Sequence, residues 1–260
     1  TVLMKTILDA KKHIITTKPF ELNPQKAKQV LVKAQRENLV IHVNSPGIRE
    51  SEYIRVIRKA AQRYQLGRPV GARFDEWVNY AEQPDGSWYD SEALCPAAPI
   101  TRLGIYAIND LTGLLGKAKK VTLLTSRIAT KRPTADNAAL GIAYENGAIA
   151  NIYVSFCVDD GQRYKTSLVI NYERGTFYFQ ILPDSLTKQH QLTLFLAIKE
   201  SEGNAKIVHL PLEDSTVGDY YWQEFHQAVL AKKPLSDKEI THIVNGIEVI
   251  AAMGKANEKD

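Results

Sequence analysis

The stretch Lys11-Lys12-His13-Ile14-Ile15-Thr16-Thr17-Lys18-Pro19-Phe20 decides how the rest of this 260-residue sequence is interpreted. Its apolar part, residues 13–16, predicts a short strand, and Lys18-Pro19 follows at the carboxyl end of that strand. A following proline holds a residue in an extended conformation. In open α/β sheets, the carboxyl ends of the strands face the crevice where ligands bind. Lys18 is therefore a candidate chemical group.

Predicted helices and strands alternate on both sides of this stretch. A helical pattern over residues 2–12 leads into the strand, and Asn23 is placed to cap a second helix. The apolar run at residues 39–43 predicts a strand buried on both faces. Residues 50–65 predict a third helix, which Gly67 would end in a left-handed conformation. This alternation indicates a parallel α/β sheet.

The sequence changes to a β-rich pattern after Pro69. Asn146-Gly147 and Glu173-Arg174-Gly175 are each placed to turn a hairpin, and successive hairpins indicate an antiparallel sheet. We therefore predict two domains: residues 1–68 with the parallel sheet, and residues 69–260 as an α+β domain with a large, mainly antiparallel sheet. The predicted strands of the second domain are residues 70–80, 121–130, 138–145, 148–156, 164–171, 176–182, 192–199 and 207–212, and its helices are residues 103–115, 219–232 and one that starts at the capping box of Ser236 and Glu239.

The composition excludes several classes of protein. With 44% hydrophobic and 24% charged residues the chain is globular, and a formal net charge of +4 does not favour a nucleic-acid partner. Cys95 and Cys157, the two cysteines, are too few for a disulfide framework and lack the spacing of a zinc site, so no metal is predicted. No apolar run approaches the length of roughly 20 residues that a membrane helix needs. These features favour a cytoplasmic protein without a membrane partner.

The predicted helix at residues 103–115 carries two different faces. Arg102, Tyr106, Asn109 and Gly113 share one side, because they are spaced i, i+4, i+7 and i+11. A face with an arginine, a phenol and an amide could line a pocket for a polyhydroxylated substrate. The alternative is the solvent-facing side of an amphipathic helix. The opposite side is apolar and consists of Gly104, Ile108, Leu111 and Leu115.

Two segments resemble signatures of the Gfo/Idh/MocA family of NAD(P)-dependent sugar and cyclitol oxidoreductases. Residues 11–20 are similar to the family segment GKHVxxEKPxA, and Leu103-Gly104-Ile105-Tyr106-Ala107-Ile108-Asn109 is similar to its DxGxHxxD signature. The similarity continues from Asp136 to Gly147 and through the final helices. The resemblance implies an amino-terminal Rossmann domain, of which residues 1–68 would be the last part, followed by the α/β domain with the large sheet.

The resemblance also implies roles for individual residues. Lys18 matches the lysine that hydrogen-bonds the reacting hydroxyl beside the nicotinamide, and Tyr106 matches the acid/base residue. Hydride removal from an alcohol needs a group that takes the hydroxyl proton, and a nearby ammonium makes a phenol more acidic. The substrate would be a sugar, a cyclitol or a sugar acid, and the cofactor NAD or NADP. The resemblance assigns substrate contacts to Arg102 and Asn109, and cofactor contacts to Lys18, Pro19, Asn44 and Arg49.

Three residues depart from the family pattern. Thr17 replaces a glutamate, Lys11 replaces a glycine, and Arg102 replaces an aspartate. The reversed charge at Arg102 leaves open a second function, a non-catalytic regulatory or binding protein on the same scaffold. The chain also lacks a G-x-G-x-x-G motif, so we expect an N-terminally truncated family member that binds dinucleotide poorly. An exposed sheet face would favour a homo-oligomer, a dimer or tetramer assembled through the sheet.

Overall fold

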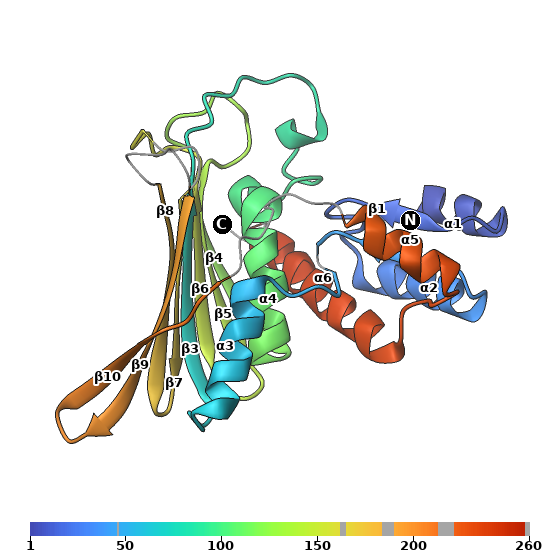
Figure 1. Ribbon diagram of the computed structural model, residues 1–260. Coiled ribbons are helices and arrows are strands. Elements are labelled where there is room, and N and C mark those ends of the chain that lie inside the picture. The colour runs from blue at the N-terminus through green and yellow to red at the C-terminus, as the bar shows by residue number, and fades with distance from the viewer. Residues whose placement is uncertain (46, 162–164, 184–189, 213–220, 258–260) are drawn as a thin grey trace.

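The computed structural model describes residues 1–45, 47–161, 165–183, 190–212 and 221–257. A large curved sheet carries helices on one face, and a smaller unit with the first helices and strands lies beside those helices (Figure 1). This arrangement confirms the predicted α/β class, with a small parallel sheet followed by a large, mainly antiparallel one. Among the described residues, no helix combines the length and the apolar character needed to cross a membrane.

The small unit contains the predicted alternation of helices and strands. Its elements are α1 (Val2–Asp9), β1 (Ile14–Thr16), α2 (Pro24–Arg36) and β2 (Ile41–Val43). The two strands pair in parallel, with Ile14 opposite Ile41. Asn23 caps α2 as predicted, because its side chain accepts a hydrogen bond of 3.0 Å from the backbone N–H of Lys26.

The large sheet has eight strands in the order β10-β9-β8-β7-β3-β6-β5-β4. Neighbouring strands are antiparallel except for β3 and β6, which run parallel. Both predicted hairpin turns are observed, at 145–148 between β5 and β6 and at 173–174 between β7 and β8. The strands are β3 (Pro69–Trp77), β4 (Ala118–Ser126), β5 (Asn137–Tyr144), β6 (Ile149–Ser155), β7 (Lys165–Tyr172), β8 (Gly175–Pro183), β9 (His190–Ser201) and β10 (Asn204–His209).

Helices α3 (Glu52–Arg63), α4 (Ile105–Leu115) and α6 (Asp237–Asn257) lie against one face of the large sheet (Figure 1). The capping box that was predicted for α6 is present, since the backbone N–H of Ser236 donates to Glu239 at 2.7 Å. Helix α5 (Trp222–Leu230) lies beside the small unit (Figure 1). Of the helix predicted at residues 219–232, the part before 221 lies outside the described residues.

Two hydrophobic cores share helix α6. The larger core joins the inner face of the sheet to α3, α4 and the second half of α6, which contributes Ile250 and Met253. The smaller core joins α1, β1, α2 and β2 to the first half of α6, which contributes Ile243 and Ile247. The two parts of the molecule are therefore fastened to the same helix.

The predicted left-handed cap of α3 lies two residues earlier than expected. Gln65, with φ of 51°, takes the left-handed position after the helix. The N–H of Leu66 then bonds to the carbonyl of Ala61 at 3.0 Å and that of Gln65 to the carbonyl of Gln62 at 3.1 Å, which is the Schellman pattern. Gly67 also has a positive φ, 81°, but in the turn that follows. The prediction placed the cap at Gly67 because glycine adopts the left-handed conformation most easily. In the structure Gln65 adopts that conformation at the end of the helix.

Candidate active site at the join of the two parts

The structure brings Lys18 and Tyr106 together. Lys18 follows β1 in the small unit, and its peptide bond to Pro19 is cis. Its ammonium lies 5.1 Å from the centre of the Tyr106 ring, which is within the range of a cation–π contact. Tyr106 belongs to α4 in the large part and is 39% exposed. The two residues are 88 positions apart in the sequence and were predicted to lie in separate domains. The fold brings their side chains into contact.

A π-helical turn, Ile100–Gly104, precedes α4 and supplies the partner of Lys18. The predicted helix at 103–115 thus begins with wider turns than an α-helix. Such turns interrupt the i to i+4 hydrogen bonds of a helix and occur frequently at functional sites. The ammonium of Lys18 donates a hydrogen bond to the backbone carbonyl of Arg102, within this turn. This contact connects the end of β1 to the start of α4.

The charge on Lys18 is easily removed. Burial lowers the pKa of Lys18 to about 8, and the guanidinium of Arg102 acts in the same direction, against the opposing influence of Cys95 and Glu76. An amine with this pKa is mostly charged at neutral pH but can release its proton. Lys18 can therefore donate a hydrogen bond to an oxygen or take part in moving a proton.

The guanidinium of Arg102 is used inside the protein. Its two Nη atoms each lie 2.7 Å from a carboxylate oxygen of Glu82. Its Cζ atom is 4.1 Å from the centre of the Tyr89 ring, 4.8 Å from that of Tyr80 and 4.7 Å from that of Phe156. Only 8% of Arg102 is exposed. The guanidinium that was predicted to contact substrate is thus held in a buried ion pair with Glu82. Toward Lys18, Arg102 presents its backbone carbonyl.

Asn109 is also engaged by its neighbours. Its Oδ1 accepts a hydrogen bond of 2.9 Å from the N–H of Gly47, and its Nδ2 donates to the carbonyl of Arg49 at 3.1 Å. The Nε2 atom of His242 on α6 lies 3.2 Å from the same Oδ1. Asn109 therefore fixes the turn that follows β2. Since Arg102 and Asn109 are both buried, the alternative of a solvent-facing helix side is wrong for these two residues.

The predicted cofactor residues separate into two groups. The N–H of Asn44 donates to the carbonyl of Thr16 at 3.2 Å, so Asn44 stands beside the segment with Lys18 and Pro19. The guanidinium of Arg49 instead pairs with Glu224 of α5 and lies 3.7 Å above the ring of Tyr221. The structure brings Asn44, Lys18 and Pro19 to the same end of the small sheet, and it directs Arg49 toward α5.

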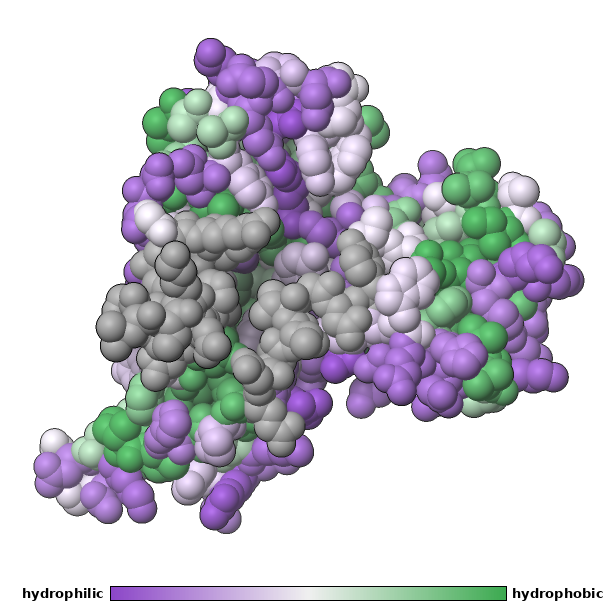
Figure 2. Space-filling view, turned by 45° about the horizontal axis from the view of Figure 1, so that its top comes forward, coloured by the Kyte–Doolittle hydropathy of each residue, from purple (hydrophilic) through white to green (hydrophobic). Residues whose placement is uncertain are grey.

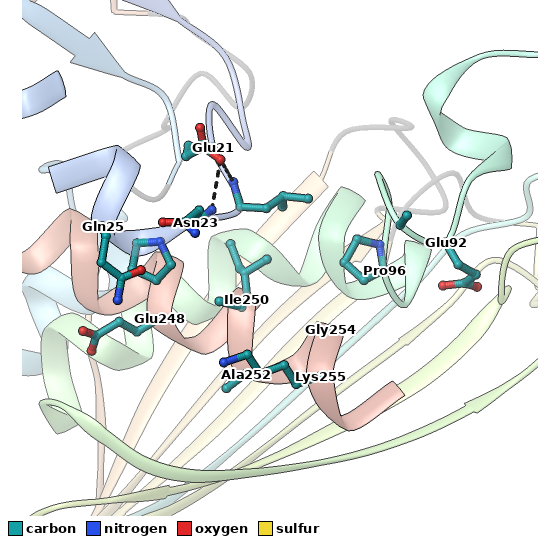
Figure 3. A pocket seen from close by; sticks show the side chains of 14 residues that line it. Glu21, Asn23, Gln25, Glu92, Pro96, Glu248, Ile250, Ala252, Gly254 and Lys255 are labelled. Atoms are coloured by element: carbon teal, nitrogen blue, oxygen red, sulfur yellow. Dashed lines mark hydrogen bonds between the residues drawn. The ribbon is translucent and has the colours of Figure 1, made fainter. Parts of the chain in front are cut away.

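A cavity of about 660 Å³ lies between the start of α2, the segment at 92–96 and the second half of α6 (Figure 3). Glu21, Glu92, Glu248 and Lys255 are its charged lining residues. Glu21 is fixed there by hydrogen bonds of 2.9 and 3.0 Å from the N–H groups of Leu22 and Asn23. Neither Lys18 nor Tyr106 lines this cavity. The chemistry of the site is therefore assigned from the Lys18–Tyr106 pair.

The carboxylate of Glu76, whose charge acts on Lys18, was missed in the sequence. It lies on β3, on the same side of the strand as Phe74 and Val78, which are each 3% exposed. Burial raises the pKa of Glu76 to about 7, and the charge of Lys18 acts in the opposite direction. A carboxylate at an inward position between two apolar residues was the available signal. Within the described part of the chain, no three His, Cys, Asp or Glu residues form a group that could hold a metal ion.

A family model and a characterised relative both match this chain. Residues 54–178 match the model of the GFO/IDH/MocA C-terminal domain. The 1,5-anhydro-D-fructose reductase of Ensifer adhaerens is 23% identical over 256 residues, which cover 96% of this chain and 73% of that protein. The match to the family model includes β3, the π-helical turn and α4, and so includes Glu76, Arg102 and Tyr106.

Solved structures show the same fold at low identity. Levoglucosan dehydrogenase, in complex with NADH and L-sorbose, has a TM-score of 0.77 at 15% identity, over 99% of this chain and 74% of its own. An NAD binding oxidoreductase from Klebsiella pneumoniae has a TM-score of 0.73 at 16% identity, with 99% and 74% covered. Both signature segments lie within the shared fold. The family model matched over residues 54–178 is that of the family whose signatures the two segments resemble.

Proposed function

We propose that this protein is a nicotinamide-dependent oxidoreductase that interconverts an alcohol and a carbonyl on a sugar, a cyclitol or a sugar acid. The observation that carries the proposal is the approach of Lys18 to Tyr106, with 5.1 Å between the ammonium and the centre of the ring. The relatives support the substrate class: one is named for the reduction of an anhydro sugar, and another was solved with NADH and a sugar. We place the protein in the cytoplasm on the sequence argument alone.

The two side chains have complementary tasks in this reaction. A bound nicotinamide supplies the hydride acceptor or donor. The ammonium of Lys18, now bonded to the carbonyl of Arg102, can donate a hydrogen bond to the reacting oxygen and stabilise negative charge on it. The phenol of Tyr106 can take the hydroxyl proton during oxidation and return it during reduction. Because Tyr106 is partly exposed, that proton can exchange with solvent.

The residues present fit one end of such a cofactor. Lys18, Pro19 and Asn44 stand at the carboxyl ends of β1 and β2, where parallel sheets bind nucleotides. The chain contains no G-x-G-x-x-G motif, whose backbone N–H groups would hold the pyrophosphate. We propose that these three residues meet the nicotinamide end. Weak binding of NAD and NADP by the 260-residue chain, measured by calorimetry, is the expected result.

Substitution of Lys18 tests the assignment. The product of the complete reading frame that contains this chain is assayed with NAD and NADP against a panel of sugars, cyclitols and sugar acids. We expect Lys18→Ala to lower kcat by a factor of about 10² to 10³, the usual effect of removing one donor that stabilises charge on the reacting oxygen. Lys28→Ala, on the exposed side of α2, is the matched control and should keep full turnover. Unchanged turnover in Lys18→Ala would overturn the assignment.

A non-catalytic binding protein on the same scaffold is the second candidate. The observation in its favour is the buried pair of Arg102 and Glu82, which puts a fixed cation beside Lys18. In that case no substrate of the panel would give turnover with either cofactor, although the folded protein would still bind a polyhydroxylated ligand. Turnover that disappears in Lys18→Ala would exclude this candidate.

We also propose that the uncovered face of the large sheet joins two copies of the chain. The helices cover the opposite face (Figure 1), and Tyr178 of β8 lies directly across from Phe195 of β9 on the uncovered one. These two residues are 46% and 38% exposed. Hydrophobic surface is visible at the β9–β10 end of the sheet in Figure 2. Light scattering should give at least twice the chain mass, and a monomeric mass for Tyr178→Asp; a monomeric mass for the unchanged protein contradicts the proposal.

A further inference from the structure

The side chain of Arg102 is held from several directions, and the same residue binds Lys18 through its backbone. Glu82 accepts hydrogen bonds from both Nη atoms at 2.7 Å, and a two-point pair of this kind fixes the plane of a guanidinium. The rings of Tyr89 and Phe156 lie against that guanidinium, with their centres 4.1 and 4.7 Å from its Cζ atom. The side chain is therefore fixed in orientation, while the backbone carbonyl accepts from Lys18.

Glu82 has a support of its own, although it lies in an irregular loop between β3 and α4. The support is Arg132, from the loop between β4 and β5, whose Nε atom donates to Oε2 of Glu82 at 2.8 Å. The Nη1 atom of Arg132 also lies 2.9 Å from Asp85 and 2.7 Å from Asp90, which belong to the same loop as Glu82. Arg132 is only 6% exposed. The loop is thus closed around one buried guanidinium.

These charged groups form one unit, which we call the arginine clasp and which consists of Glu82, Asp85, Asp90, Arg102 and Arg132. It has three carboxylates for two guanidinium groups, so both arginines find their counter-charges within the clasp. The hydrogen bonds from Arg102 lower the pKa of Glu82, which therefore stays charged at neutral pH. Because burying charges is costly, a buried ion pair adds little net stability. The geometry that the clasp imposes on Arg102 is a better explanation of its presence.

We infer that Glu82 and Arg132 are positioning residues of the candidate active site. By fixing the side chain of Arg102, they aim its backbone carbonyl at the ammonium of Lys18. Glu82 acts through Arg102, and Arg132 acts through Glu82. The part of this inference that concerns turnover rests on the proposed oxidoreductase function. The part that concerns the contact of Lys18 with the carbonyl does not, because that contact is a property of the folded chain.

The carbonyl of Arg102 can be observed directly in the 260-residue chain. Arg102-Leu103 is the one Arg-Leu pair in the sequence, so ¹³C-carbonyl arginine combined with ¹⁵N-leucine gives a single NMR signal for this carbonyl. The signal is recorded at about pH 6, where the ammonium is charged because the pKa of Lys18 is about 8. Lys18→Met, which keeps the length of the side chain, gives the position of the signal without the hydrogen bond.

Glu82→Gln keeps the size of the side chain and removes its charge. A neutral amide offers one oxygen, which cannot accept from both Nη atoms of Arg102 and from Arg132 as the carboxylate does. We therefore expect the Arg102 carbonyl signal to move most of the way to its position in Lys18→Met. Arg132→Met should move the signal in the same direction by a smaller amount, since it leaves the pair of Glu82 and Arg102 in place.

Arg127→Met is the matched control. Arg127 belongs to the same loop as Arg132 but is exposed, and its Nη1 atom donates to the carbonyl of Pro133 at 3.4 Å, outside the clasp. The signal should not move in this variant. If Glu82→Gln folds, as judged by circular dichroism, and gives the signal of the unchanged chain, the inference is wrong. If Glu82→Gln does not fold, an unmoved signal in Arg132→Met overturns it instead. An equal movement in Arg127→Met would also overturn it, since it would show a general effect of loop charge.

Kinetics connect the contact to turnover. In the product of the complete reading frame, Glu82→Gln should lower kcat between about tenfold and 10²-fold, the loss expected when a reacting group is misplaced by about 1 Å. KM should change less than about twofold, because Glu82 acts through another residue instead of binding substrate. A large rise in KM at constant kcat would identify Glu82 as a substrate contact and overturn the positioning role.

A double variant separates positioning from a general loss of stability. In the Lys18→Ala background, Glu82→Gln should have almost no further effect on kcat, because it acts through Lys18. An equal loss in both backgrounds would show that Glu82 acts independently of Lys18, and the inference would fail. If the unchanged protein shows no turnover, the proposed function fails, while the carbonyl signal still decides whether the clasp positions the contact.

Discussion

The small two-stranded unit and the large sheet differ in how each buries its core. The large sheet has eight strands and packs its inner face on α3, α4 and α6. The small unit has two short strands and two helices, and part of its core comes from α6, through Ile240, Ile243, Val244 and Ile247. A two-stranded sheet rarely has independent stability. The small unit therefore depends on a helix that belongs equally to its neighbour.

This difference has a consequence for the site. Lys18 lies on the dependent unit, and Tyr106 lies on the part with the large sheet. The distance between the ammonium and the phenol ring is maintained by α6, which lies behind both parts, and by the bond from Lys18 to the carbonyl of Arg102. A change that loosens only the small unit should thus remove Lys18 from the site while the large sheet remains folded.

The largest effect is expected from Ile247→Ala. Ile247 is fully buried in the small core, and truncation of such a residue costs about 2–5 kcal/mol. Hydrogen exchange should show loss of protection at the N–H of Ile14, which bonds to the carbonyl of Val40, and little change at Phe74 of β3. Ile250→Ala is the control, because Ile250 lies three residues further along α6 in the large core. Equal loss of protection in both parts with Ile247→Ala would show that the molecule unfolds as one unit.

An intermediate effect is expected from Asp136→Asn, at the end of the large sheet. The carboxylate of Asp136 is fully buried and accepts hydrogen bonds from the N–H groups of Ile128, Ala129 and Thr130, at 2.8, 2.8 and 2.7 Å. Burial alone would raise the pKa of Asp136, but these donors lower it below its usual value. The amide cannot carry the charge, so we expect a loss of about 1–3 kcal/mol at pH 7.

The pH dependence gives this prediction its sign. A carboxyl whose pKa is lowered by folding stabilises the protein above its usual pKa of about 3.9 and loses that contribution as the pH falls toward its folded value. Urea unfolding should therefore show a gap between Asp136→Asn and the unchanged chain that narrows below about pH 4. Asp159→Asn, at an exposed position, is the control with no gap at either pH. A gap that widens in acid would contradict the assigned charge state.

The order of elements was accessible from the sequence because each local pattern agreed with the whole. The strand before Lys18, the cap at Asn23 and the turn at Asn146-Gly147 each depend on residues within a few positions of one another. The Lys18–Tyr106 pair was accessible only through family signatures. Helical spacing also identified the apolar side of α4, where Ile108, Leu111 and Leu115 are buried.

The partners of the charged and polar side chains could not be predicted from local patterns in the sequence. Helical spacing placed Arg102 and Asn109 on one face, but it carries no information about what lies opposite that face. Glu82, which binds Arg102, comes from a loop 20 residues earlier, and Gly47, which binds Asn109, comes from a turn 62 residues earlier. Glu76 was missed because a single carboxylate in a strand has no motif. These contacts depend on tertiary packing, which local patterns do not encode.

The smallest effect is expected where the two parts share one backbone feature. Lys11 after α1 and Gln65 after α3 both hold the left-handed position of a helix end, with φ of 56° and 51°. Glycine adopts this conformation without strain but loses more freedom on folding, so Gln65→Gly should gain only about 0.5 kcal/mol. Lys11→Gly should gain less, because it also removes the exposed ion pair of 3.1 Å between Lys11 and Glu37. Thermal unfolding followed by circular dichroism measures the first gain, and hydrogen exchange at Ile14 measures the second. If Lys11→Gly protects the small unit more than Gln65→Gly stabilises the sheet, then strain at its own helix end, and not its dependence on α6, limits the stability of the small unit.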